Sequence, residues 1–429
     1  MEQIKVPTGE ALFAERLPNG LMVFVLPKTG FLRKYAVLST NYGSLDSKFR
    51  VPDEGVIKVP AGIAHFLEHK LFEEEDGNAF DRFAQFGASA NAFTSYTQTS
   101  YLFSTVENWK EALAYLITFV NNPYLTEENV EKEKGIIEQE IRMYQDHPDR
   151  KLHSNLLTNL YHNNPLRIDI GGTVESVNAI TVDLLWKCYN TFYQPSNMAL
   201  FVVGDVDVDE CFRIVRDNYR NWNQPNEDLI ERFYPPEPET VLNHWVEDHL
   251  DISCPRYLLG FKNKPQWEGL DLLRQQITMG IVWRLIVGRS SQIYEELYNK
   301  NLVNDSFGAS FSSSPQYAYS VVGSETDHPE KLHEELTQII TKLQKQSISE
   351  TDVERLKRQM YGGHVAAFDS LEYVANRYIS HYFAETPFHK FLPTLQSITA
   401  EDVSQALNDS LDLEYSTVSI LWPARENNG

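Results

Sequence analysis

The sequence predicts an α+β fold made of two homologous halves, each a mostly antiparallel sheet with helices packed on one face. The first observation is an internal echo: residues 126–134 resemble residues 349–357, and residues 179–183 resemble residues 397–401. Both echoes place a Ser or Thr cap, followed by acidic residues, at the start of a helical pattern. Two such matches in the same order indicate an internal duplication.

The second observation is the order of the predicted elements, which is the same in both halves. Strands come first, then a helix, then a pair of strands, then several long helices and a closing strand. The predicted strand regions are residues 21–26, 35–42, 90–106 and 199–203 in the first half, and residues 257–261, 305–323 and 417–421 in the second. Strands that are grouped, and do not strictly alternate with helices, favour an α+β arrangement.

The chain length of 429 residues suits more than one core. Pro235, Pro236 and Pro238 follow a polar stretch near the middle of the chain, which is typical of a linker. We therefore expect an α+β domain over residues 1–220, a linker over residues 221–240, and a related α+β domain over residues 241–429.

Composition and charge exclude some classes of function. A net charge of -22 is unlike that of a nucleic-acid-binding protein and disfavours docking on an anionic membrane, so we expect neither partner. No signal peptide pattern and no apolar run of membrane-spanning length are visible. The three cysteines, at positions 188, 211 and 254, lack any paired spacing and are expected to be free thiols. These features predict a cytoplasmic protein.

The strongest chemical motif is His65-Phe-Leu-Glu68-His69, in a segment whose neighbours favour a helix. Positions i, i+3 and i+4 of a helix lie on one face, so both imidazoles can bind one ion while Glu68 stands beside them. Zinc suits two histidines and a carboxylate, and a neighbouring carboxylate can accept a proton from a metal-activated water. The alternative is an amphipathic helix that merely presents a polar face.

A third ligand is expected from a second helix, over residues 126–145. Glu133 and Glu140 are two turns apart and share a face that borders a stripe of isoleucines. Carboxylates beside apolar side chains are costly unless they are paired or bound to a metal. The alternative is that both are ordinary solvated glutamates.

Together these segments resemble the inverzincin zinc peptidases, the family of pitrilysin, insulysin and the mitochondrial processing peptidase. The resemblance rests on the inverted motif at residues 65–69, on Glu140 at the end of residues 133–140, and on residues 87–95 and 193–198. The resemblance covers the whole chain and is strongest over residues 61–204. Within the family, the chain is similar to the metal-bearing subunit of the bacterial two-chain members.

The resemblance implies a role for each of these side chains. It implies a Zn²⁺ ion held by His65, His69 and Glu140, with Glu68 as the general base. Residues 1–220 are then expected to form the zinc-binding catalytic domain, and residues 241–429 a related domain without a metal site. Glu133 matches the acidic residue of the family that steadies a ligand histidine, a role that outer-shell residues commonly have.

The resemblance also implies a binding site for a peptide substrate along an edge strand, at Asn91, Ala92, Phe93 and Thr94. An edge strand binds a peptide through backbone hydrogen bonds and tolerates many side chains. The residues themselves agree, because residues 90–103 are strand-like. For Asn91, a turn residue at the entry to the strand is the alternative.

One departure from the family concerns the partner. Tyr298 stands where the resemblance places an Arg, and Asp305 where it places a Tyr; that Arg/Tyr pair binds the substrate carbonyl in active members. We therefore expect a zinc endopeptidase subunit for short unfolded peptides, completed in a heterodimer by a paralogous chain that carries the pair. A homodimer is a variant of this prediction. The alternative function is a non-catalytic structural or peptide-binding subunit of a larger complex.

Overall fold

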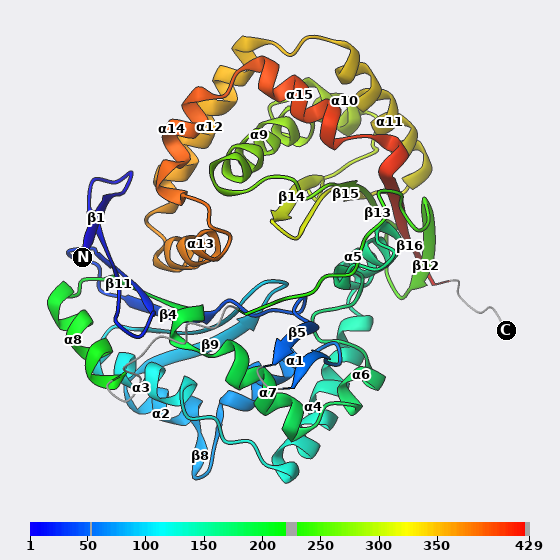
Figure 1. The fold of residues 1–429 in the computed structure, drawn as a ribbon. Helices are drawn as coiled ribbons and strands as arrows, with labels where there is room; N and C mark the ends of the chain where they lie inside the picture. Colours follow the sequence, from blue (N-terminus) through cyan, green and yellow to red (C-terminus); the bar gives the residue numbers. More distant parts are fainter. Residues whose placement is uncertain (52–53, 220–229, 425–429) are drawn as a thin grey trace. The chain divides into compact units, whose positions relative to one another are not determined.

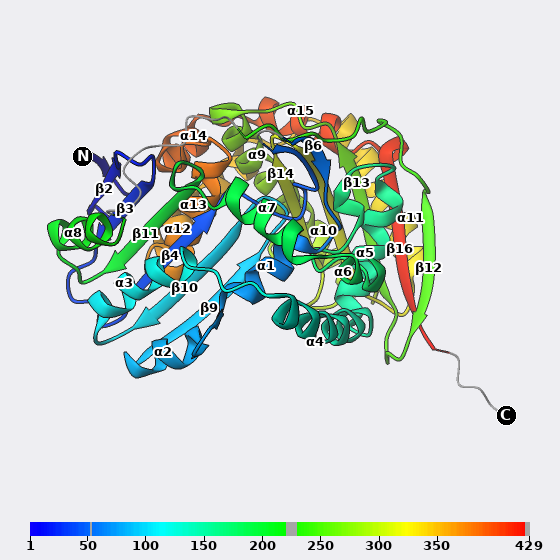
Figure 2. The same ribbon diagram turned by 60° about the horizontal axis from the view of Figure 1, so that its bottom comes forward.

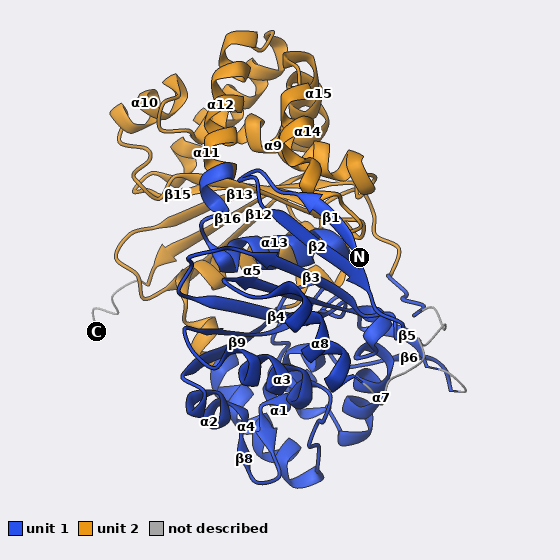
Figure 3. Cartoon of the chain, turned by 90° about the vertical axis from the view of Figure 1, so that its left-hand side faces the viewer, with its two compact units in different colours: residues 1–141, 169–234, 365–383 blue, residues 142–168, 235–364, 384–429 orange. Residues whose placement is uncertain are grey.

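The computed structural model describes residues 1–51, 54–219 and 230–424, which form two compact units (Figure 3). Unit 1 consists of Met1–Ile141, Asp169–Tyr234 and Val365–Phe383. Unit 2 consists of Arg142–Ile168, Pro235–His364 and Ala384–Gly429. Each unit therefore contains one segment from the opposite half of the chain.

Unit 1 is built on a mixed, mostly antiparallel sheet with the strand order β1-β2-β3-β11-β4-β10-β9 (Figure 1). Its strands are β1 (Glu2–Lys5), β2 (Ala11–Arg16), β3 (Met22–Pro27), β4 (Lys34–Thr40), β9 (Ala88–Thr94), β10 (Thr99–Thr105) and β11 (Met198–Gly204). Two small hairpins accompany it: β5 (Lys48–Val51) with β6 (Gly55–Lys58), and β7 (Glu73–Glu74) with β8 (Gly77–Asn78).

Unit 2 repeats the last five strands of this order, as β12-β16-β13-β15-β14. They are β12 (Trp245–Leu250), β13 (Arg256–Asn263), β14 (Gly308–Ser314), β15 (Tyr317–Glu325) and β16 (Ser416–Pro423). In both units the closing strand runs parallel to one neighbour and antiparallel to the other: β11 with β3 and β4, β16 with β12 and β13. The predicted fold class, with two related halves, is confirmed.

The helices also follow one another in matching order. In the first half they are α1 (Ile63–Leu71), α2 (Ala79–Gln85), α3 (Trp109–Val120), α4 (Glu127–Gln145), α5 (Pro148–Leu160), α6 (Val174–Asn178), α7 (Val182–Phe192) and α8 (Val208–Asn218). In the second half they are α9 (Gly269–Val287), α10 (Gln292–Asn299), α11 (Pro329–Lys345), α12 (Glu350–Ala367), α13 (Leu371–Phe383), α14 (Phe391–Ser397) and α15 (Ala400–Ser410). The two sequence echoes lie at the starts of α4 and α12, and of α7 and α15.

The helices cover one face of each sheet, as predicted, but each sheet also carries one helix from the other half on its second face. In unit 1, Val23 and Val25 of β3 belong to the core beneath the helices. Phe24, between them, points the opposite way, as alternation along a strand requires. There it contacts the rings of Tyr378 and Tyr382 of α13.

Unit 2 shows the reciprocal arrangement with α5, which lies beside β13 and β16 (Figure 2). Gly260 of β13 makes this close approach possible, because a Cβ there would come within 2.8 Å of a side-chain carbon of Leu156 on α5. Ser419 of β16 donates a hydrogen bond to the carbonyl oxygen of Leu152 on the same helix.

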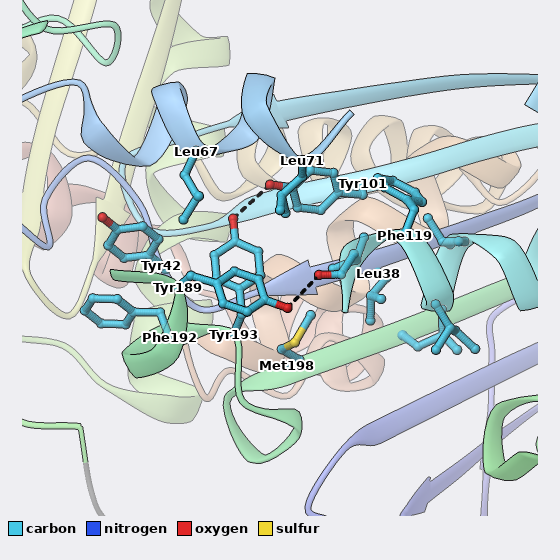
Figure 4. Close-up of a cluster of buried hydrophobic side chains, with 14 of the residues drawn as sticks. Leu38, Tyr42, Leu67, Leu71, Tyr101, Phe119, Tyr189, Phe192, Tyr193 and Met198 are labelled. Carbon is cyan, nitrogen blue, oxygen red and sulfur yellow. Dashed lines mark hydrogen bonds between the residues drawn. The ribbon is translucent and has the colours of Figure 1, made fainter. Parts of the chain in front are cut away.

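The core of unit 1 beneath α1 is rich in buried tyrosines (Figure 4). Leu67 and Leu71 of α1 point into it. The Tyr101 and Tyr193 hydroxyls share a hydrogen bond of 2.8 Å, and the Tyr189 hydroxyl donates to a backbone carbonyl. Because these polar groups bond to one another or to backbone, they can be buried at little cost. They form the part of the core that lies beneath α1.

The predicted domain boundaries and linker remain sequence predictions. Residues 221–229 of the linker lie outside the described residues. The described remainder is tied to unit 1 through Arg232, which forms an ion pair with buried Asp46, and to unit 2 through Glu237, which pairs with Lys262. Over the described part of the chain, no helix combines the length and the apolar character needed to cross a membrane.

Candidate metal centre

Helix α1 carries the first part of the site, and its start is fixed by close backbone packing. Gly62, at the N-cap, has φ 88°, a left-handed conformation that glycine adopts without strain. A Cβ at Gly62 would lie 2.4 Å from the Gly171 carbonyl oxygen, and one at Gly172 would lie 2.6 Å from that of Ala61. The hydroxyl of Ser176 donates to the same Ala61 oxygen. These contacts hold α1 although no side chain caps it.

Helix α4 carries the second part and is capped reciprocally. The backbone N–H of Asn129 donates to the Thr126 hydroxyl, and the backbone N–H of Thr126 donates to the Asn129 side chain. Such a cap satisfies backbone donors that a helix start leaves unpaired. Val130 and Ile137 are buried, and the helix presents Glu133 and Glu140 next to this apolar face.

His65, His69 and Glu140 offer ligand atoms that all lie within 4.8 Å of one another. Nε2 of His69 is 3.4 Å, and Nε2 of His65 is 3.8 Å, from Oε2 of Glu140. Zinc bonds of about 2.0–2.1 Å in a tetrahedral site put ligand atoms roughly 3.4 Å apart, which these distances approach. Two imidazoles and one carboxylate are also one of the donor sets found in catalytic zinc sites. The residues therefore fit a zinc ion.

Glu133 contacts the far side of one of these histidines: its Oε1 lies 3.1 Å from Nδ1 of His69. Burial works to raise the pKa of Glu133, but the hydrogen bond to His69 and the charges of His69 and Lys70 lower it below its ordinary value. For His69, burial works to lower the pKa, yet the bond to Glu133 and the nearby Glu140 and Glu68 raise it. An ionised Glu133 thus orients the His69 ring.

Glu68 is only 8% exposed, and its Oε2 accepts a 2.6 Å hydrogen bond from the hydroxyl of Thr94. Burial raises the pKa of Glu68 above its ordinary value, and nearby Glu140 adds to the increase, while Thr94 and His69 oppose it. A carboxylate whose pKa is shifted toward neutrality is a better proton acceptor at neutral pH. The arrangement can accept a proton on the oxygen that Thr94 does not hold.

The predicted substrate-binding residues lie on β9, the last strand in the order of the sheet. At the hairpin, Ser95 donates its backbone N–H to the carbonyl oxygen of Gln98. Residues that hydrogen-bond to the neighbouring strand alternate along an antiparallel strand, so Phe93 and Asn91 direct their backbone groups at β10. The N–H and C=O groups of Ala92 and Thr94 then face the open edge. The side chain of Asn91 accepts the Ala92 N–H at 2.9 Å. Thr94 also contacts Glu68, a link that sequence reasoning did not foresee.

Lys70 is a further residue of the site that the sequence prediction missed. Its side chain is fully buried, and its ammonium group lies 3.7 Å from Oε2 of Glu133. A signal was present in the sequence: Lys70 falls in phase with Ile63, Phe66 and Leu67, on the apolar stripe of α1. A charged residue on such a stripe has to find partners inside the protein.

The two residues expected to replace the family's Arg/Tyr pair lie in unit 2. Tyr298, near the end of α10, is 53% exposed and stacks on Tyr294 with ring centroids 6.0 Å apart. Asp305 forms an exposed ion pair of 3.2 Å with Arg289. An acidic side chain at position 305 offers no donor for a developing oxyanion.

Two family models match the chain. Residues 58–174, which include every proposed ligand, match "Insulinase (Peptidase family M16)", and residues 179–360 match "Peptidase M16 inactive domain". The chain belongs to peptidase family M16. The resemblance to insulysin-type peptidases is thereby confirmed.

Similar proteins cover nearly the full length of the chain. The "Uncharacterized zinc protease YmfH" of Bacillus subtilis (strain 168) is 40% identical over 96% of this chain and 97% of its own length. An M16-like peptidase from Alicyclobacillus acidocaldarius has a solved structure with a TM-score of 0.93 and 36% identity, over 97% of this chain and 99% of that one. A Helicobacter pylori protease, at 21% identity, shares the fold with a TM-score of 0.82 over 96% and 99% of the two chains.

Proposed function

We propose that this M16 protein is a zinc-dependent endopeptidase subunit of the inverzincin type, which hydrolyses peptide bonds of short unfolded peptides. The observation that carries the proposal is the convergence of His65, His69 and Glu140, with the buried carboxylate of Glu68 beside them. The names of relatives such as "Uncharacterized zinc protease YmfH" support it. The cytoplasmic location expected from the sequence stays a proposal.

In the proposed mechanism, His65 and His69 of α1 and Glu140 of α4 would hold the zinc ion. When bound there, zinc would supply a Lewis acid that polarises a peptide carbonyl group and acidifies a water molecule. Glu68 accepts a proton from the attacking water molecule on Oε1, because the Thr94 hydroxyl occupies its Oε2. It then donates that proton to the leaving amine. Glu133 keeps the His69 ring in place throughout by its contact with Nδ1.

The substrate is proposed to lie along β9, as an added antiparallel strand. The backbone groups of Ala92 and Thr94 would pair with the peptide, and the side chain of Asn91 would release the Ala92 N–H that it accepts. Because backbone groups make these bonds, the sequence specificity is loose. Phe93 and Asn91, which pair with β10, hold the strand in register.

A partner chain is proposed to supply the groups that stabilise the developing oxyanion. The support is the chemistry at positions 298 and 305, where Tyr298 and the anionic Asp305 stand in place of an Arg and a Tyr. A paralogous subunit that carries the pair would complete the site in a heterodimer. A homodimer with another oxyanion donor is the lesser variant.

The test is a quenched-fluorescent peptide assay of the zinc-loaded chain, alone and after addition of the candidate paralogue. Losing one oxyanion donor costs about 100- to 1000-fold in rate, so the isolated chain should be nearly inactive and the pair active. Full activity of the isolated chain would contradict the need for a partner. Zinc content, expected to be one ion per chain, is measured on the same preparation.

The alternative is a non-catalytic structural or peptide-binding subunit, which the family description "inactive domain" for residues 179–360 keeps open. Inactivity in both conditions, with zinc bound, would favour it. A chain that binds no zinc after reconstitution would contradict the metal site itself.

A further inference from the structure

Lys70 has contacts that the proposed mechanism does not use. Its ammonium group is completely buried and faces three acceptors: the carboxylate of Glu73, the carbonyl oxygen of Asn129 at 3.2 Å, and Oε2 of Glu133 at 3.7 Å. An ammonium group has three donors, and a buried charge is tolerated only when it is paired and hydrogen-bonded. Lys70 therefore makes two hydrogen bonds, to Glu73 and to the Asn129 carbonyl oxygen, and a further ion pair with Glu133.

These acceptors come from two elements besides α1. Glu73 belongs to β7, while Asn129 and Glu133 lie one turn apart on α4. Lys70 thus joins the helix that carries both histidines to the helix that carries Glu140. It contacts α4 at the turn that also presents Glu133 to His69.

We propose that Lys70 is a positioning residue of the metal centre, which holds Glu133 by Oε2 so that Oε1 stays on Nδ1 of His69. His69 then keeps Nε2 directed at Glu140, from which it lies 3.4 Å. This inference rests on the proposed function only in taking His65, His69 and Glu140 as the zinc ligands. It assigns the Lys70–Glu133 pair a role in zinc affinity that a plain packing role would not have.

The size of the effect follows from the behaviour of outer-shell residues. Mutating a group that orients a ligand histidine typically weakens metal affinity by about 10- to 100-fold. In the native chain Glu133 is only 9% exposed. Without Lys70, the Glu133 carboxylate keeps His69 as a partner, but its second oxygen loses the ammonium group that fixes it. We expect Lys70→Met to fall in this range.

The experiment measures zinc affinity of the full chain by competition with a chromophoric chelator. Lys28→Met is the matched control, because Lys28 is also a buried lysine paired with a glutamate, Glu10, at 3.0 Å, and its other contact is the ring of Phe31, away from the site. Lys70→Met should weaken zinc binding about 10- to 100-fold. Lys28→Met should stay within about threefold of the native chain, as expected of a site outside the outer shell.

A double-mutant cycle with Glu133→Gln separates positioning from packing. If Lys70 acts through Glu133, adding Lys70→Met to Glu133→Gln should change zinc affinity by less than about threefold. A second full loss in the double variant would overturn the proposal, since Lys70 would then act independently of Glu133. Native zinc affinity in Lys70→Met would overturn it as well.

Folding of Lys70→Met is checked by thermal unfolding of the metal-free protein. If that variant does not fold, the pair Lys70→Met with Glu73→Met replaces it, because exchanging an ion pair for apolar side chains often preserves stability. The same loss of zinc affinity is expected there, and native affinity would overturn the proposal. Failure of the native chain to bind zinc would instead contradict the proposed function.

Discussion

Helices α4 and α12 begin alike and carry different chemistry. Both start with a hydroxyl cap followed by acidic residues, and both occupy the same place in the element order of their half. Aligned by that start, Leu356 stands opposite Glu133 and Gly363 opposite Glu140. Leu356 is 1% exposed and belongs to the core of unit 2, whereas Glu133 is buried against charged partners.

The difference teaches what a buried carboxylate requires. Glu133 is stable in its position because His69 contacts one oxygen and Lys70 the other. At position 356 the surroundings are apolar, and a leucine gains free energy from burial without any partner. The duplicated scaffold thus accepts either solution, and the neighbouring helix decides which one is stable.

The largest effect is expected from substitutions in the candidate metal site, which lies in the first half. Glu68→Gln should reduce peptide cleavage by the complete enzyme by about 10²- to 10⁴-fold, because the proton acceptor is lost while the ligands stay. Glu140→Gln should instead weaken zinc binding. Activity and zinc content are measured on both variants. Equal zinc loss in the two would contradict the division of roles between Glu68 and Glu140.

A smaller effect, on stability, is expected from placing a glutamate at position 356, where the second half has a leucine opposite Glu133. Leu356→Glu buries a carboxylate in the apolar core of unit 2, and should destabilise the protein by at least about 3 kcal/mol. Urea unfolding at neutral pH measures the effect.

Gln359→Glu is the control for this substitution, since it adds the same charge at an exposed position of α12. It should change stability by less than about 0.5 kcal/mol. A Leu356→Glu variant as stable as this control would mean that unit 2 can solvate a carboxylate at position 356, and the physical basis of the comparison would be lost.

Much of the candidate site could be predicted from sequence because helix geometry is local. The spacing of His65, Glu68 and His69 puts them on one face in any helix, and the two-turn separation of Glu133 and Glu140 does the same. That Glu140 meets the histidines depends on how α1 and α4 pack, which periodicity does not encode; the family resemblance supplied it. Lys70 was missed although its place on the apolar stripe was visible.

The strand grouping and the duplication were also predictable, the latter from the repeated helix starts. The packing of α5 on the sheet of unit 2, and of α13 on the sheet of unit 1, was not predictable. An amphipathic pattern tells which face of a helix is buried but not which sheet covers it. A clue lay in Gly260, whose missing side chain makes room for Leu156. A lone glycine in a strand, however, is equally consistent with a bulge or a tight bend.

The smallest expected effect concerns the second pair of matching helix starts, in α7 and α15. Thr181 caps α7 by accepting the N–H of Leu184, whereas Thr399 caps α15 with Asp402 at the equivalent position, which closes a capping box. Burial works to raise the pKa of Asp402, but bonds from Arg274 and Thr399 lower it below its ordinary value of 3.8. The α15 cap therefore contains an ionisable group at the position where α7 has a leucine.

Asp402→Asn should cost about 1–2 kcal/mol at neutral pH, the range of a helix cap with a charged acceptor. A lowered pKa in the folded state means that the carboxylate stabilises the fold above its unfolded pKa and loses this effect as the pH falls through the folded value. The stability difference between Asp402→Asn and the native chain should hence be constant above about pH 5 and shrink below about pH 4. Thr181→Ala, with no carboxylate in its cap, should cost about 1 kcal/mol at every pH. Urea unfolding of both variants between about pH 3.5 and 7 decides the point, because a pH-independent deficit in Asp402→Asn would show that the charge of Asp402 does not stabilise α15.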